Sequence, residues 1–345
     1  MDLDHARELQ AAANRLREQV TYVVGIADEA KRQKAEDSRE GYFVGISGGV
    51  INREDTRTAL STFHVDGEPM FTITPVTNVP DIGSLARALA PKFRSTFSHL
   101  GHLSHQVDHE LYIAKRIAHT PQGALNLAYQ VISLLRLRGK CMINGITFSN
   151  TPWSQVAAHT GDVFLQPLED PRSPLWESEK GISQGDLDWA AERLIRDFDL
   201  REQPSYRLAY ESAADAPFLK DTRTAVARIW SGIESLFDVQ NELSFRLSMY
   251  AAVLISDDVA ERIAIQTKFK RLYGLRSKAV HGAKMDDAKL AETLISSWSL
   301  LRDLLLACIR TGPSVPLTAE LDRALLGHRL ARDEGCTPSP YETPS

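Results

Sequence analysis

The spacing of hydrophobic residues changes along the chain, and each change predicts a different kind of element. In residues 3–35, apolar side chains recur at three- and four-residue steps between Leu9 and Ala30, with charged residues at the other positions. This spacing predicts an amphipathic helix within residues 1–40. Such a helix needs a partner surface, which is either the rest of the chain or, in a short coiled-coil arm, a second molecule.

A second pattern, between residues 41 and 76, is typical of strands. The β-rich runs YFVGIS, TALSTFHV and PMFTITPV are separated by turn residues, among them Asp66 and Gly67. Asp-Gly between two such runs is a strong hairpin signal. The later runs CMINGITFSN and VFLQPLE predict further short strands. We therefore expect a small antiparallel sheet in this part of the chain.

Helical periodicity also occurs in the N-terminal half. It covers residues 83–95 and 106–138, with a break at Thr120-Pro121 and a stop at Gly139. Residues 167–185 are rich in Pro, Gly, Ser and charge, which indicates a loop or linker, and residues 185–198 predict one more helix. The region 41–200 is therefore predicted to be a mixed α/β domain.

From residue 206 onward the pattern is almost entirely helical. Residues 219–238 place their large apolar side chains on one face, and three further helices are expected over 241–255, 257–281 and 286–309. Four such helices with short connections predict a bundle over residues 206–312. A small helix at 314–326 and a disordered tail at 328–345 would follow. The predicted fold class is α+β: a mixed α/β region with a small antiparallel sheet, then an all-α bundle of four to five helices.

Composition narrows the class of protein. The 345 residues contain 43% hydrophobic and 25% charged residues, with a formal net charge of −5. These values are ordinary for a soluble globular protein, and the net charge confines any nucleic-acid contact to a local basic patch. Three cysteines, the lack of a signal-peptide pattern and the lack of a long apolar run favour a cytoplasmic protein without membrane contact. We expect no cofactor.

The candidate chemistry lies in residues 268–282, KFKRLYGLRSKAVHG. This run contains no acidic residue and includes Arg276, Ser277 and His281. A guanidinium binds phosphate, and an imidazole exchanges protons near neutral pH, so the pair suits phosphodiester cleavage without a metal. Four more cations would attract an RNA backbone without reading its sequence: Lys268, Lys270, Arg271 and Lys278.

Two other groups of residues have candidate roles. His99, His102, His105 and His109 are spaced by three, three and four residues, so on a helix they would share one side and could hold a metal together with Asp108 or Glu110. The alternative for these histidines is a solvated or partner-facing polar surface. Glu234 and Arg246 each lie on an otherwise apolar helix and are predicted to form a structural ion pair.

The C-terminal features together resemble the HEPN superfamily, in particular its ApeA-like branch. The resemblance rests on IWSGIESLF at 229–237, NELSFRLSMYAAVL at 241–254 and LYGLRSKAVHG at 272–282, and it covers about residues 206–312. The motif of the family is an arginine, four to six residues and a histidine, which Arg276 and His281 match with four residues between them. The resemblance implies a helical bundle that acts as a metal-independent endoribonuclease, commonly a toxin or antiviral effector. The N-terminal half resembles no family.

The resemblance also implies roles and partners. Arg276 would bind the phosphate, His281 would relay a proton, and Ser277 would hold either group by a hydrogen bond. Because five residues rotate a helical side chain by about 140°, Arg276 and His281 do not share a narrow face, and a homodimer could bring two pairs into one cleft. A trigger or regulatory protein would bind the N-terminal region. The alternative is a non-catalytic HEPN module for nucleotide binding, sensing or assembly.

Overall fold

The structure is a computed structural model, and it confirms the α+β class. A sheet with short helices occupies the N-terminal region, and helices make up the rest. The predicted helix within residues 1–40, the turn at Asp66-Gly67 and the tail beyond residue 330 lie outside the described residues. The described ranges are 41–48, 60–65, 68–76, 79–139, 142–168, 174–176, 181–237, 239 and 241–330.

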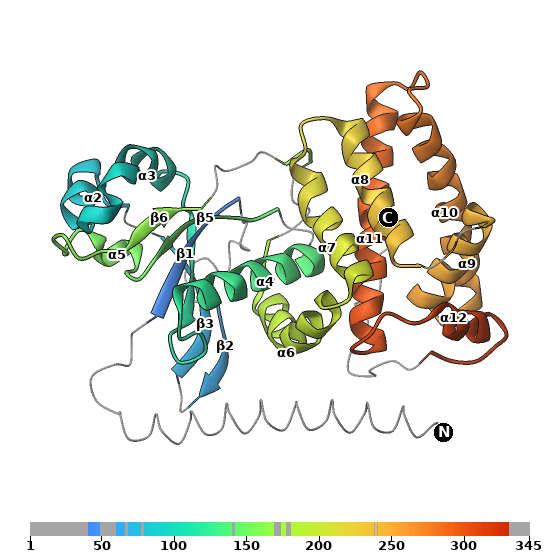
Figure 1. Cartoon of the computed structure of the whole chain (residues 1–345), viewed down its shortest axis with the longest axis horizontal. Coiled ribbons are helices and arrows are strands. Elements are labelled where there is room, and N and C mark those ends of the chain that lie inside the picture. The colour runs from blue at the N-terminus through green and yellow to red at the C-terminus, as the bar shows by residue number, and fades with distance from the viewer. Residues whose placement is uncertain are drawn as a thin grey trace. The chain divides into compact units, whose positions relative to one another are not determined.

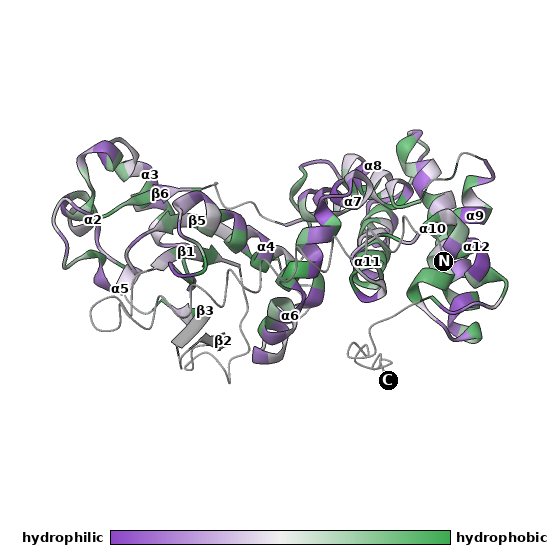
Figure 2. Cartoon of the chain, turned by 60° about the horizontal axis from the view of Figure 1, so that its bottom comes forward, coloured by the Kyte–Doolittle hydropathy of each residue, from purple (hydrophilic) through white to green (hydrophobic). Residues whose placement is uncertain are grey.

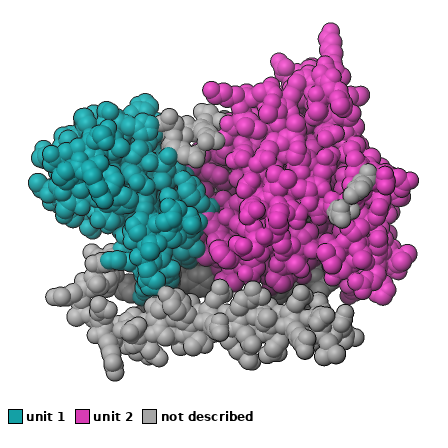
Figure 3. Space-filling view, in the orientation of Figure 1, with its two compact units in different colours: residues 1–47, 53–129, 145–170 teal, residues 48–52, 130–144, 171–345 magenta. Residues whose placement is uncertain are grey.

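The chain forms two compact units, which Figure 3 shows in different colours. The first contains residues 1–47, 53–129 and 145–170, and the second contains residues 48–52, 130–144 and 171–345. The predicted bundle at 206–312 therefore lies within the second unit. This unit also takes in residues 130–144 and the helix that precedes the bundle.

The first unit is organised on a six-stranded sheet with the order β2-β3-β4-β1-β5-β6, and Figure 1 labels all of these strands except β4. The pairs β1–β4, β2–β3, β3–β4 and β5–β6 are antiparallel. In this register the buried apolar residues of β1 and β4 meet, with Val44 opposite Leu111. The strands are β1 (Gly41–Ser47), β2 (Leu60–Val65), β3 (Glu68–Pro75), β4 (His109–Ala114), β5 (Asn144–Ser149) and β6 (Leu165–Pro167).

Strand β4 corrects the prediction of helix for residues 106–120. Only the second predicted helix of that stretch forms, as α4 (Pro121–Gly139), which begins and ends where the break and stop signals indicated. The residues HELYIA of β4 are buried at five of six positions, and the strand lies inside the sheet, where it pairs with β1 at one edge and with β3 at the other. A strand buried on both faces lacks the alternating pattern that identifies a strand in sequence.

Short helices cover the first unit's core. They are α2 (Ile82–Ala88), the 3₁₀ helix η1 (Pro91–Thr96), α3 (Phe97–Ser104) and α5 (Trp153–Val156). Leu85, Leu89 and Leu100 pack with Ile146 and Trp153 into one buried cluster. The single helix expected at 83–95 is therefore two, because Pro91 cannot continue α2.

The second unit contains seven complete α-helices in its described part, together with the C-terminal half of α4. The predicted helices are confirmed within a few residues, and α10 and α11 begin after the caps Asp258 and Asp286. None of the described helices is both long and apolar enough to cross a membrane. The helices are α6 (Gln184–Arg201), α7 (Pro204–Asp215), α8 (Thr222–Ser235), α9 (Leu243–Ile255), α10 (Val259–Val280), α11 (Asp287–Thr311) and α12 (Thr318–Leu325).

Apolar and polar positions alternate along these helices, and the apolar ones form the core (Figure 2). The core also contains a polar network around Asp197, which is fully buried. Its carboxylate lies 2.8 Å from the Arg201 guanidinium and accepts hydrogen bonds from Tyr206 Oη and Gln130 Nε2. Burial raises the pKa of Asp197 even though Arg201 opposes the shift. This network is a structural anchor of α6 against its neighbours.

Candidate active site at the end of α10

The end of α10 holds the predicted histidine. His281 is the C-cap residue, its amide donates to the Ser277 carbonyl at 3.0 Å, and its side chain is exposed. Gly282 follows with φ +72°, and the Ala283 amide donates to the Lys278 carbonyl at 3.0 Å. A glycine in the left-handed region with this bond is the usual way to end a helix. The local sequence therefore ends α10 at His281 and exposes its imidazole.

Arg276 lies one turn earlier and points to a different neighbour. Its Nη2 is 3.3 Å from Glu234 Oε1 of α8, and its guanidinium carbon is 5.7 Å from the Tyr273 ring centroid. Tyr273 packs edge-on against the buried Trp230. The Arg276 side chain is 23% exposed and that of Glu234 is 30% exposed. Arg276 is therefore held against α8 by an ion pair and an aromatic ring.

The predicted pair of Glu234 with Arg246 is wrong. Glu234 binds Arg276 instead, and Arg246 Nη2 lies 2.5 Å from Tyr250 Oη, which donates to Asp322 Oδ1 of α12 at 2.7 Å. The reason is that the packing of α8 on α10 and of α9 on α12 separates the two side chains. Sequence patterns place each residue on its helix, but they do not determine which helices become neighbours.

Arg276 and His281 are not in contact within one chain. In the part that the structure describes, no hydrogen bond or ion pair joins their side chains, as expected from their rotation of about 140° around the helix axis. One chain therefore presents a partly buried guanidinium on the α8 side of α10 and an exposed imidazole at its end.

Arg223 is a residue of this site that the sequence analysis missed. It lies in the first turn of α8, where its Nη1 donates to the Ala279 carbonyl at 2.6 Å and its Nη2 to the Ala283 carbonyl at 3.1 Å. These two carbonyls flank His281. A cation in the first turn of a helix is electrostatically unfavourable, and that anomaly is the signal in the sequence that could have identified it.

The predicted RNA-binding cations differ in their surroundings. Lys270 and Lys278 are exposed, and Lys270 Nζ lies 5.3 Å from the Phe245 ring centroid. Arg271 is 3.3 Å from Glu292, which also binds Lys289. Lys268 and Ser277 are half-buried. Arg271 is thus already in an ion pair, whereas Lys270 and Lys278 project from the surface of α10.

The four histidines do not gather around one point. His99 and His102 lie on α3 and His105 caps it, but His109 belongs to β4, where its Nδ1 is 3.0 Å from Asp108. No group of three or more His, Cys, Asp or Glu side chains in the described ranges could hold a metal. The strand at His109 removes the shared helical side on which the metal hypothesis depended.

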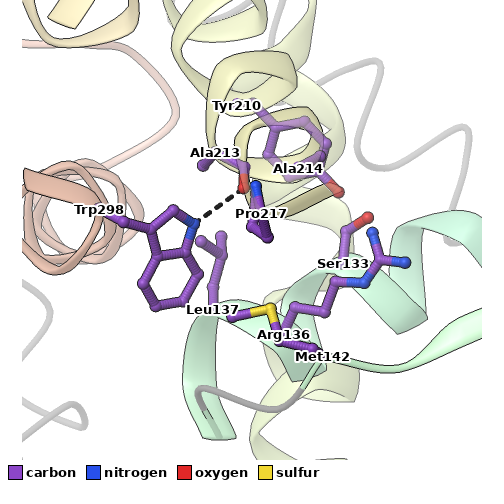
Figure 4. A pocket seen from close by; sticks show the side chains of 9 residues that line it. All are labelled: Ser133, Arg136, Leu137, Met142, Tyr210, Ala213, Ala214, Pro217 and Trp298. Carbon is purple, nitrogen blue, oxygen red and sulfur yellow. Dashed lines mark hydrogen bonds between the residues drawn. The ribbon is translucent and has the colours of Figure 1, made fainter. Parts of the chain in front are cut away.

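A small cavity in the second unit contains none of these residues. It lies among Ser133, Tyr210, Pro217 and Trp298, where Trp298 Nε1 donates to the Ala213 carbonyl at 2.9 Å (Figure 4). Its free volume is ≈ 10 Å³, which is about the space of one water molecule. This cavity is too small for a nucleotide.

Comparisons with protein-family models, with curated proteins and with solved structures found no match.

Proposed function

We propose that the helical unit is a metal-independent endoribonuclease with Arg276 and His281 as its catalytic residues. The observation that carries the proposal is their joint position at the C-terminal end of α10, with the imidazole exposed and the guanidinium supported by Glu234 and Tyr273. These are the two side chains that cleavage of a phosphodiester needs in the absence of a metal. The HEPN-like sequence around them supports the same reaction.

The reaction is an internal transfer of the phosphate. A general base removes the proton of an RNA 2′-OH, the 2′ oxygen forms a bond to the adjacent phosphorus, and the bond to the 5′ oxygen breaks. A general acid gives that 5′ oxygen a proton. The products are a 2′,3′-cyclic phosphate and a free 5′-OH, and no water is consumed. His281 relays the proton, and Arg276 stabilises charge on the phosphate oxygens.

The surrounding residues have supporting roles. Lys268, Lys270, Arg271 and Lys278 attract the RNA backbone, and Ser277 orients one of the two catalytic side chains. Glu234 occupies one side of the Arg276 guanidinium. Because a guanidinium has five N–H donors in a planar fork, the opposite side is available to a phosphate. Glu234 then fixes the orientation of Arg276.

The active form in this proposal is a homodimer. In one chain Arg276 and His281 point to different sides of α10, so a second copy related by a two-fold axis supplies the missing half of each cleft. The N-terminal unit restrains the nuclease until a trigger or regulatory protein binds, and the protein acts in the cytoplasm as a toxin or antiviral effector. The HEPN-like sequence is the basis for this biological role.

A second candidate is a non-catalytic nucleotide-binding, sensor or assembly module. The observation in its favour is the Glu234–Arg276 ion pair, which partly neutralises the phosphate-binding side chain. This candidate predicts that the protein binds a nucleotide or a partner protein and cleaves no RNA. The two candidates therefore differ in one direct measurement.

The test is cleavage of an end-labelled RNA by the purified full-length protein in excess EDTA. We expect fragments with 2′,3′-cyclic phosphate ends, and a rate at least about 100-fold lower for His281→Ala and for Arg276→Ala, since general acid–base and charge stabilisation each contribute that much. His328→Ala and Arg207→Ala are matched controls, because both residues are exposed and lie outside the proposed site. Equal cleavage by wild type and both site variants would rule out the proposal.

A further inference from the structure

The first unit carries a basic surface on the segment α2–η1–α3. We call residues 82–105 the histidine-bearing lobe. The sequence has no Asp or Glu from Ile82 to Val107, although the whole chain has a net charge of −5. The lobe thus concentrates positive charge in a protein that is otherwise acidic.

The lobe has an apolar inner side and a basic outer side. Leu85, Leu89, Leu100 and Leu103 are fully buried, so the inner faces of α2 and α3 belong to the core of the unit. Every basic or histidine side chain of the lobe is exposed: Arg87, Lys92, Arg94, His99, His102 and His105. Figure 1 shows α2 and α3 next to each other, and the hydropathy colours of Figure 2 mark hydrophilic positions on both ribbons. The charged side chains therefore lie on the outside of these packed elements.

The neighbouring acids bind chiefly to local partners, although Asp81 also interacts electrostatically with Arg87 of the lobe. Asp81 accepts hydrogen bonds from the Ser84 amide and hydroxyl, which lower its pKa, and Asp162 is bound to His159 at 2.9 Å, which lowers its pKa. In contrast, Arg94, His102 and His105 have no side-chain hydrogen bond or ion pair among the described residues. The acids have local partners and these three outward groups have none, so the lobe can attract an external anion.

We propose that the outer surface of the histidine-bearing lobe binds the phosphate backbone of a single-stranded nucleic acid without reading its sequence. The exposed hydroxyl residues Ser95 and Ser98 lie between Arg94 and His99, and all of these side chains can donate to phosphate oxygens. They lie on three short elements rather than on one long helix, so a flexible single strand follows them more readily than a rigid duplex.

An acidic protein is a less suitable partner for this surface. The centre of a protein interface normally contains apolar or aromatic anchors. In the lobe, Ile82 at the start of α2 is the one large hydrophobic side chain that is exposed, and the ring of Phe93 is half-buried with Lys92 Nζ 4.8 Å from its centroid. A single exposed apolar residue at one end of the lobe does not provide a central apolar anchor. The surface offers charge and hydroxyl groups, which fit a polyphosphate chain. This binding site belongs to the first unit and contains neither Arg276 nor His281, so the inference does not depend on the proposed nuclease activity.

The test measures binding of a fluorescent oligo(dT) of about 20 nucleotides to the full-length protein by anisotropy. DNA lacks the 2′-OH, so the probe reports binding without cleavage even if the protein is a ribonuclease. We expect Lys92→Gln with Arg94→Gln to weaken binding about 25-fold in about 0.1 M salt and to reduce the salt slope by about 1.4, because each single-strand phosphate contact contributes about 0.7 to the slope. His102→Glu with His105→Glu should weaken binding as well.

The matched control is Arg207→Gln with Lys220→Gln, which removes the same charge from exposed positions of the second unit. Weakening by the lobe variants alone supports the proposal. Equal weakening by control and lobe variants assigns the attraction to net charge and overturns it. Displacement of the probe by poly-glutamate as effectively as by unlabelled oligo(dT) also overturns it, in favour of an acidic protein partner. Since every substituted side chain is exposed, unchanged circular dichroism and melting temperature confirm that the variants are folded.

Discussion

At the scale of single residues, the buried carboxyl group of Glu110 is a feature that the proposed nuclease does not use. Glu110 lies on β4 opposite Gly45 of β1 and Thr74 of β3, and it is only 6% exposed. Its Oε2 accepts a hydrogen bond from the Trp153 amide at 2.8 Å. Burial raises its pKa to about 7, against the smaller opposing effect of that amide. The side chain is therefore neutral in mildly acidic solution and charged in basic solution.

This pKa predicts how the stability of the first unit changes with pH. The folded pKa of about 7 is above the ordinary value of 4.5, so the folded state holds the proton more tightly. The free energy of unfolding should fall as pH rises from about 4.5 to about 7, by at most about 3 kcal/mol, and stay low above that. Glu110→Gln keeps an acceptor for Trp153 without a charge, so it should remove this fall.

The measurement is urea unfolding followed by tryptophan fluorescence at about pH 5 and pH 8. The free energies of unfolding of wild type and Glu110→Gln should differ at about pH 8 and be similar at about pH 5. The isosteric control Glu202→Gln alters an exposed carboxylate and should keep the wild-type pH dependence. A Glu110→Gln variant with the same loss of stability at high pH as wild type would show that burial of this carboxyl is not responsible.

At the scale of elements, arginines from neighbouring helices bind the C-terminal carbonyls of several helices. Arg310 donates to the Ile255 carbonyl of α9, Arg196 to the Ile309 carbonyl of α11 and Arg223 to the Ala279 carbonyl of α10. Each last turn has carbonyls without an intrahelical partner and the negative end of the helix dipole. A guanidinium donates hydrogen bonds to these carbonyls, and its positive charge interacts favourably with the negative end of the dipole. These contacts therefore fix the ends of neighbouring helices relative to one another inside the bundle.

The contact at α10 gives a prediction about the candidate site. Arg223→Gln removes a charged fork that binds two carbonyls, which should lower the free energy of unfolding by about 1.5–3 kcal/mol. Hydrogen exchange of the amides around residues 277–283 should accelerate, because the turn that bears His281 loses its outside support. Arg223→Lys retains the positive charge but lacks the planar guanidinium, so its free energy of unfolding should lie between those of wild type and Arg223→Gln.

The control for this prediction is Arg228→Gln on the same helix. Among the described residues, Arg228 forms ion pairs with Glu211 at 3.8 Å and Asp215 at 3.4 Å, whose side chains are about half exposed. Surface pairs of this kind contribute about 0–1 kcal/mol. Faster exchange at the end of α10 in both variants would attribute the effect to α8 as a whole rather than to the Arg223 contact.

The packing of α7 on α8 depends on a glycine. A Cβ atom added at Gly232 would lie 2.7 Å from the Ser212 Cβ and 3.1 Å from the Ala209 Cα, so the two helix backbones would have to move apart. We expect Gly232→Ala to lower the free energy of unfolding by about 1–3 kcal/mol in urea denaturation. Gly274→Ala on α10 has no atom within 4 Å of its new Cβ and should instead stabilise the helix by up to about 1 kcal/mol. Equal effects of both substitutions would contradict this explanation.

At the scale of the whole molecule, the separation of Arg276 and His281 predicts that activity depends on two chains. Light scattering should give the mass of a homodimer for the active protein. An Arg276→Ala chain retains His281, and a His281→Ala chain retains Arg276. When the two inactive variants are mixed and allowed to exchange subunits, mixed dimers contain one complete pair, and RNA cleavage should return. Full activity of a monomer, or no recovery from mixed dimers of confirmed composition, would exclude a shared site.

Much of the second unit was predictable from the sequence because its helix ends depend on nearby residues. The side chains of Asp258 and Asp286 cap α10 and α11 by accepting hydrogen bonds from the amides three residues later. Gly282, two residues after the last residue of α10, adopts the positive φ that ends the helix. The amphipathic spacing of each helix likewise follows from a period of 3.6 residues. These signals place His281 at the exposed end of a helix and Arg276 on a different side of it.

Other features required the tertiary structure because they depend on which segments meet. β4 is a strand since β1 and β3 bind both of its edges, although its own residues lack a clear strand pattern. Glu234 meets Arg276 rather than Arg246, and Arg223 reaches the carbonyls on either side of His281, since α8 packs on α10. Local sequence thus determined where the arginine and histidine lie on their helix. Only the packing of neighbouring elements decided what supports them, because contacts between residues distant in sequence leave no local pattern.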